Sequence, residues 1–118
     1  MTEVAKALKA FYSGCGIPAY TEDSVPDTAE LPYITYTAVE SGVFSSATHQ
    51  ARVWYPGTGY AAVNAKADEI TKAIGPGKKL KAGKGFLFLF PGTPLCQMQP
   101  ADDKTRIVYI NLEIRCYV

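Results

Sequence analysis

The sequence predicts an α+β domain, in which an antiparallel sheet of about four strands carries two main helices packed on one face. Three observations lead to this fold class. Two stretches place apolar residues at helical spacing, other stretches alternate or are rich in β-branched and aromatic residues, and the order is helix, strands, helix, strands. The links between strands are short enough for antiparallel pairing, and no β–α–β unit repeats. The length of 118 residues fits one domain, residues 1–118.

Two segments are expected to be helical. The first, residues 2–13, places Val4, Leu8 and Phe11 on one face and is followed by glycines that end a helix. The second runs from about residue 58 to residue 74 and ends before a Gly-Pro-Gly sequence. Its apolar residues form a single stripe, so both helices have one side that can pack on a sheet.

Four longer segments and one short one are expected to be extended. The clearest is residues 105–118, where apolar and polar side chains alternate along the whole length. Residues 33–39 are rich in β-branched and aromatic residues, residues 50–55 alternate, and residues 86–90 are apolar on both faces. The short piece is residues 17–20, because the residue before a proline is disfavoured in helical geometry.

Segments rich in glycine, proline or polar residues are expected to be loops. They are the acidic segment 22–30, the serine-rich segment 41–48, the lysine-rich segment 78–85 and the proline-containing segment 91–104. The second and the last of these suit contacts that form when copies assemble.

A sheet covered by helices on one side leaves its other side to water or to another subunit. The strand at residues 86–90 stays apolar on its second face, and the strand at residues 50–55 carries a tryptophan on its outer face. Either both faces are covered within the chain, or the uncovered face is an interface, because large exposed apolar patches are uncommon on monomers. We favour the interface. Its expected residues are Arg52, Trp54, Phe86, Phe88 and Phe90.

The charges are segregated along a chain whose net charge is only +1. Residues 21–40 hold five acids and no lysine or arginine, whereas residues 66–84 hold six lysines and two acids. Near-neutral net charge argues against a dedicated nucleic-acid-binding protein. Segregated charge can steer unlike faces of identical subunits together, although two separately solvated loops would give the same pattern.

No pattern in the sequence indicates a catalytic, cofactor or metal site. His49 is the only histidine, and a lone histidine beside a polar loop is expected at the surface. Cys15, Cys96 and Cys116 are an odd number without Cys-x-x-Cys spacing, which argues against a disulfide framework or a zinc site. The glycines of residues 77–85 have the wrong spacing for a phosphate-binding loop. We therefore expect a protein that is not an enzyme and that binds no cofactor and no metal.

The location is also constrained by what the sequence lacks. No apolar run approaches the roughly 20 residues that cross a bilayer, and the N-terminus lacks the basic-then-apolar layout of a signal peptide. We expect a soluble chain that is made in a reducing cytosol and has no membrane partner.

Three stretches carry a resemblance to a known family. They are residues 25–36 (VPDTAELPYITY), residues 53–60 (VWYPGTGY) and residues 85–94 (GFLFLFPGTP). These stretches resemble small neck proteins of long-tailed bacteriophages, and the whole layout is similar to the tail-terminator (tail-completion) or head–tail joining class. None of the three stretches is catalytic, so the resemblance is one of layout.

The resemblance implies an α+β subunit that forms a ring, typically a hexamer, in the tail or neck of the virion, and that is present in the host cytoplasm before assembly. Such a ring caps the tail tube, ends its polymerisation and joins it to the head-side connector. The implied partners are further copies of the chain, the tail tube protein and the head-side connector protein, with DNA present only by passage through the lumen.

The resemblance does not say which residues face that lumen. Our own assignment from the charge pattern is the lysine-rich segment, with Lys78, Lys79, Lys81 and Lys84 facing the lumen or DNA, because a ring of such segments would gather many charges. Two alternatives stay open: a head-closure or minor capsid protein of the same neck, and a small cytosolic enzyme that uses Cys15 or His49.

Overall fold

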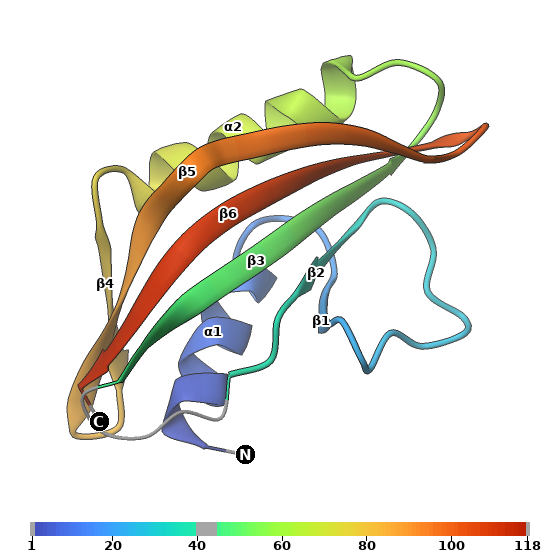
Figure 1. Ribbon diagram of the computed structural model, residues 1–118. Helices are drawn as coiled ribbons and strands as arrows, with labels where there is room; N and C mark the ends of the chain where they lie inside the picture. The colour runs from blue at the N-terminus through green and yellow to red at the C-terminus, as the bar shows by residue number, and fades with distance from the viewer. Residues whose placement is uncertain (1, 40–44, 118) are drawn as a thin grey trace.

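The computed structural model describes residues 2–39 and 45–117, which form two helices and six strands (Figure 1). In chain order the elements are α1 (Glu3–Ser13), β1 (Ala19–Thr21), β2 (Tyr33–Tyr36), β3 (Ser45–Pro56), α2 (Ala61–Ile74), β4 (Lys78–Ala82), β5 (Gly85–Asp102) and β6 (Thr105–Tyr117).

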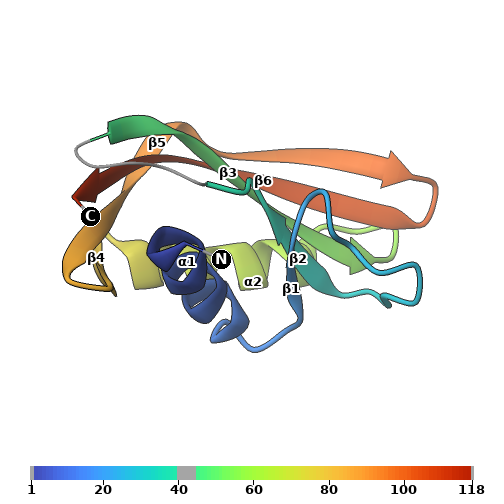
Figure 2. The same cartoon turned by 90° about the horizontal axis from the view of Figure 1, so that it is seen from below.

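The six strands make one sheet in the order β1-β2-β3-β6-β5-β4. Strand β1 pairs with β2 in parallel, and every other neighbouring pair is antiparallel. The expected fold class, an antiparallel sheet of about four strands, is therefore wrong: the sheet is mixed and has six strands, curled into a half-barrel (Figure 2). The two additional strands, β1 and β4, are short and lie at the two edges.

Strand β4 replaces part of the expected lysine-rich loop. Its burial alternates, because Ala82 is buried and Leu80 half-buried, whereas Lys79 and Lys81 are exposed. Lysine is uncommon in strands, so the lysine content of this segment hid the alternation of buried and exposed residues that is typical of a strand. Only Gly83 and Lys84 remain as the turn that leads into β5.

Strand β5 is longer than expected, because it continues to Asp102 through the segment 91–104 that was expected to be a loop. Four residues, 92–95, bulge opposite Asn111 before pairing with β6 resumes at Cys96. In the described residues, no strand pairs with the outer side of β5 beyond Leu89. Prolines are tolerated at such an edge because their missing amide hydrogen would have no partner.

Strand β3 also starts earlier than expected. Residues 45–48, assigned to a serine-rich loop, pair with residues 113–116 of β6. The rest of that segment, residues 41–44, lies outside the described residues.

Both helices lie on the same side of the sheet, inside its curve (Figures 1 and 2). Helix α1 is capped by Thr2, whose hydroxyl oxygen accepts a hydrogen bond from the Ala5 amide at 3.1 Å. Its buried stripe ends at Tyr12, and the expected Phe11 is only half-buried beside it. The core fills the space between helices and sheet and consists mainly of Val4, Leu8, Tyr12, Val63, Ala67, Ile70, Ile74, Ala51, Val53, Leu87, Leu89, Val108, Ile110, Leu112, Ile114 and Cys116.

Candidate subunit interface on the uncovered sheet face

The outer side of the curled sheet carries no helix of the described chain (Figure 2). Its residues are those that alternate with the core residues of each strand. Two rows cross β4, β5 and β6: Lys79, Phe88 and Arg115 are register partners, as are Lys81, Phe86 and Tyr117. The strand alternation that buries Leu87 and Leu89 thus brings three phenylalanines to the outer side.

The rings on this side form an aromatic cluster of Phe86, Phe88, Phe90 and Tyr117. Phe88 stacks on Phe90 with ring centroids 5.9 Å apart, and it meets the edge of Tyr117 at 5.8 Å. Phe86 and Tyr117 are 38% and 42% exposed, which is high for large apolar side chains. Aromatic surface of this kind is enriched where proteins bind one another.

Cations lie over the same rings. The Lys79 Nζ is 3.8 Å from the ring centroid of Phe86, and the Arg115 guanidinium carbon is 5.3 Å from that of Phe90. Both distances are those of cation–π contacts. The two ion pairs found among residues 2–39 and 45–117 are Lys6–Glu3 and Lys66–Glu69, so within those residues the cations of the cluster make no ion pair. The acid on the same face is Glu113, the register partner of Phe90.

A polar network occupies the middle of the same face. Arg52 Nε donates to Gln50 Oε1 at 3.2 Å, and Gln50 Nε2 donates to Asn111 Oδ1 at 2.9 Å. Asn111 Nδ2 in turn donates to the Pro94 carbonyl at 2.9 Å and to Gln97 Oε1 at 3.0 Å. Asn111 therefore holds the β5 bulge against β6, and a hollow of about 640 Å³ opens beside it.

Trp54 lies on this face at the β2 side. Its Nε1 donates to Thr35 Oγ1 at 2.9 Å, and its ring is 5.8 Å from that of Tyr33. This hydrogen bond leaves Trp54 half-buried within its own chain. Trp54 was expected at the interface, but these contacts are made with β2 of its own chain.

All five residues expected at the interface lie on the uncovered face, but in two groups. Phe86, Phe88 and Phe90 lie together, whereas Arg52 and Trp54 lie farther along the sheet. The distance can be followed on β6: Arg52 is opposite Tyr109, and Phe88 is opposite Arg115, six residues later. Sequence reasoning did not select Arg115 or Tyr117 for the interface. The alternation of residues 105–118 was the signal that could have found them.

The four lysines assigned to a lumen do not form one row. Lys79 and Lys81 share the face of the aromatic cluster, and Lys84 is exposed at the β4–β5 turn. Lys78 is half-buried and lines a hollow of about 300 Å³ between the helices, together with Phe11 and Cys15.

His49 is buried, so its expected place at the surface is wrong. Only 1% of it is exposed, and its Nε2 is hydrogen-bonded to the Tyr12 hydroxyl at 2.9 Å. Its Nδ1 has no hydrogen-bond partner among residues 2–39 and 45–117. Burial lowers the pKa of His49 to about 4, so the imidazole is neutral at pH 7.

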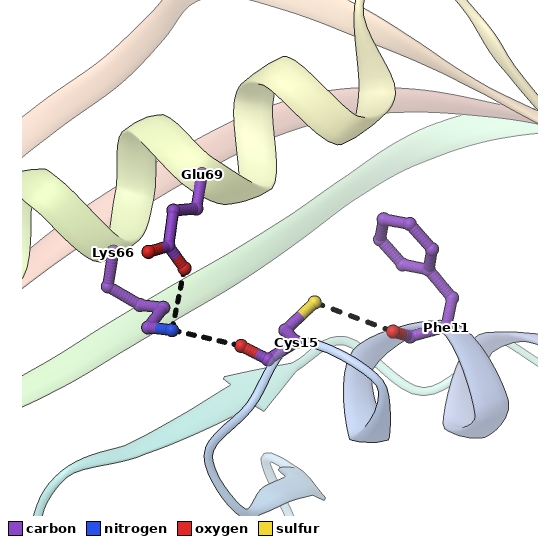
Figure 3. Close-up of polar contacts among 4 residues, drawn as sticks. All are labelled: Phe11, Cys15, Lys66 and Glu69. Carbon is purple, nitrogen blue, oxygen red and sulfur yellow. Dashed lines mark hydrogen bonds and ion pairs between the residues drawn. The ribbon is translucent and has the colours of Figure 1, made fainter.

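Cys15 and Cys96 are not poised for nucleophilic chemistry. Burial raises the pKa of Cys15 and of Cys96, and the Cys15 thiol donates to the Phe11 carbonyl at 3.4 Å (Figure 3). A thiol with a raised pKa is a weak nucleophile at neutral pH. Across the described part of the chain, no three His, Cys, Asp or Glu residues gather as a metal site would require.

Figure 3 also shows how the two helices are tied together. Lys66 of α2 donates from Nζ to the Cys15 carbonyl at 3.0 Å and to Glu69 Oε2 at 2.7 Å. The Glu69 hydrogen bond is the main reason that the pKa of Lys66 is raised. A lysine is well suited to this place, because the end of α1 presents carbonyl oxygens.

The described residues thus form a small half-barrel whose outer sheet face carries no helix. Comparison with solved structures finds the same fold in a chain from a structure described as the virion of a native gene transfer agent particle, with a TM-score of 0.67 and 17% identity over 97% of this chain and 92% of that one. A second solved chain of unstated function matches with a TM-score of 0.69 and 16% identity over 98% and 94%. These likenesses show the fold.

No family model matches the chain, and no curated protein matches it. Within residues 2–39 and 45–117, no helix has the length and apolar character needed to cross a membrane.

Proposed function

We propose that this chain is a structural virion protein that forms a ring at the junction of head and tail, caps the tail tube and joins it to the head connector. The observation that carries the proposal is the fold shared with a chain of a gene transfer agent virion over 97% of this sequence. The structural likeness is to a virion chain, and the resemblance of three sequence stretches to phage neck proteins is the reason for proposing the neck within the virion.

The uncovered sheet face supplies the surface that a ring needs. Its exposed rings are apolar surface that contact between subunits would remove from water, and its cations can pair with acids of another copy. We place Phe86, Phe88 and Phe90 at the subunit contact, with Arg52 and Trp54 at its margin. The work of such a protein is done by shape and contact, so the proposal requires no catalytic group.

The positions of the four lysines reduce the number that we propose to face the lumen. Lys79 and Lys81 share a face with the aromatic cluster, so we assign them to the contact between subunits. Lys84, exposed at the tip of the β4–β5 turn, is the lysine that we propose to face the lumen through which DNA passes.

Negative-stain electron microscopy of the purified chain, alone and mixed with the tail tube protein, tests the proposal. Closed rings in either sample are the expected result, and the tube protein should stop polymerising when the rings are present. A chain that stays monomeric alone and with the tube protein contradicts the proposal.

The likeness to a virion chain also fits a head-closure or minor capsid protein of the same neck, because it does not specify a position in the particle. Binding measured separately against tail tube protein and against portal-side proteins distinguishes these roles. A tail terminator binds the tube protein, whereas a head-closure protein binds only the portal side.

A further inference from the structure

The acidic and cationic segments lie at opposite ends of the sheet. The acidic loop, residues 22–32, connects β1 to β2 at one edge, whereas the lysines of β4 lie at the other edge (Figure 1). Glu22, Asp23, Asp27 and Glu30 are all exposed, and the loop contains no lysine or arginine. The loop therefore presents a concentrated negative charge away from the core.

The opposite end presents a cationic–aromatic patch, which we define as Lys79, Lys81 and Arg115 with the aromatic cluster. All three cations are exposed, and two of them lie over rings of the cluster. Within the described residues, none of the three makes an ion pair with a carboxylate. The patch thus combines apolar surface, which favours contact, with positive charge, which selects an acidic partner.

We infer that the acidic loop of one copy docks on the cationic–aromatic patch of the next copy, head to tail. The inference rests on the proposed ring. Within one chain the loop joins β1 and β2, whereas the patch spans β4, β5 and β6, with β3 between the two groups of strands. Glu113, the register partner of Phe90, is the acid on the patch face, and in the described residues it makes no ion pair with the patch. A second copy can therefore bring several acids to the three cations at once. A contact between two unlike surfaces is heterologous and repeats until the ring closes, whereas patch against patch would bring cations together.

Charge reversal at both surfaces tests the docking. One variant combines Lys79→Glu, Lys81→Glu and Arg115→Glu, a second combines Glu22→Lys, Asp23→Lys and Asp27→Lys, and a third combines all six changes. These side chains are all exposed, so the fold should be retained. Sedimentation velocity over a range of concentrations measures assembly, and circular dichroism checks folding.

Each single-surface variant should associate at least tenfold more weakly than the wild type, because its loop and patch then carry like charges. The variant with both surfaces reversed should regain assembly, since its loop is basic and its patch acidic. Added salt should weaken the wild type and the doubly reversed variant alike. The control, Lys72→Glu with Lys104→Glu, reverses charge at two exposed positions outside the loop and the patch and should assemble normally.

Assembly that survives both single-surface reversals overturns the docking, as does a doubly reversed variant that stays dissociated while folded. Rings that persist in those variants leave the proposed neck function intact. A wild-type chain that never associates, alone or with tube protein, overturns both. If a triple variant unfolds, the milder pair Lys81→Gln and Asp27→Asn gives the same comparison, and each should weaken association.

Discussion

The hydroxyl group of Tyr12 and the Nε2 atom of His49 lie 2.9 Å apart and join α1 to β3 in the core. Tyr12 is completely buried, and its ring also stacks on Tyr36 with centroids 4.5 Å apart. Burial raises the pKa of the Tyr12 hydroxyl above its ordinary value and lowers that of His49 to about 4. Both side chains are therefore neutral at pH 7, and the pair is a hydrogen bond without charge.

This pair makes stability depend on pH in a defined window. The pKa of His49 is about 4 in the folded chain, below its ordinary 6.5, so between these values the unfolded chain binds a proton that the folded chain does not. The free energy of unfolding should be highest above pH 6.5 and should fall as pH drops to 4, by on the order of 3 kcal/mol for this group. Urea unfolding at several pH values measures the slope.

The matched variant is His49→Gln, which removes the titrating group from the core. It should be less stable at pH 7, yet its stability should change less between pH 6.5 and 4 than that of the wild type. An unchanged pH slope would show that His49 is not the source of the effect.

Lys66 should stabilise the packing of the two helices. Lys66→Met removes the hydrogen bond to the Cys15 carbonyl and should lower the free energy of unfolding by about 1–2 kcal/mol. Glu69→Gln keeps that bond and loses only a surface ion pair, so it should cost less than about 1 kcal/mol. Lys72→Met, at an exposed position of the same helix, is the control in chemical unfolding. Equal losses for Lys66 and Lys72 would contradict the assignment.

Gly92 should tolerate no side chain. A Cβ atom there would lie 2.7 Å from the Asn111 carbonyl oxygen, which belongs to the backbone of β6 and cannot move aside easily. Gly92→Ala should therefore destabilise the chain by about 1–3 kcal/mol. Gly59→Ala is the comparison, because nothing lies within 4 Å of its Cβ position. Thermal unfolding should separate the two variants, and similar melting temperatures would argue against a tight bulge.

Phe86 should matter for assembly more than for folding. It is 38% exposed and lies at the surface of the sheet, so Phe86→Ser should lower the melting temperature only modestly while weakening ring formation several-fold. Met98→Ser removes a side chain that is 60% exposed on the β5–β6 hairpin, away from the aromatic cluster. Size-exclusion chromatography with light scattering gives the comparison. Rings that are lost equally in both variants would remove the special role of the cluster.

The strongest sequence signals gave the right elements. The alternation of residues 105–118 placed Val108, Ile110, Leu112, Ile114 and Cys116 on one face, and all five are buried. Helical spacing found both helices to within about three residues. These patterns are reliable because a long segment repeats the same spacing of apolar and polar residues many times.

The strand segments that were missed contain residue types that are uncommon in strands. Lysines concealed β4, and prolines concealed the outer part of β5, since both residue types disfavour strands in general and are tolerated at edges. The burial of His49 was also missed. Alternate residues of a strand point to the same face, so His49 lies on the core face with Ala51 and Val53. The pairing of β1 with β2 could not be read at all, because a parallel contact depends on where the loop between them returns.

The candidate interface was predictable in part. Alternation alone assigned Phe86, Phe88 and Phe90 to one face, and the structure adds which groups lie beside them. Lys79 and Arg115 come to these rings through strand pairing across β4, β5 and β6, and that information exists only in the register. Their participation in a subunit contact remains a prediction.

The prolines on the outer part of β5 have a consequence for how copies can join. Pro91 and Pro100 offer no amide hydrogen along an edge that no other described strand covers, and Pro94 lies in the bulge between them. A neighbouring chain therefore cannot easily extend the sheet there by backbone pairing, the route by which β-proteins grow into open-ended fibres. Along this edge, contact with a neighbouring copy would have to be made by side chains, which can set a fixed angle between two copies and so suit an assembly of finite size.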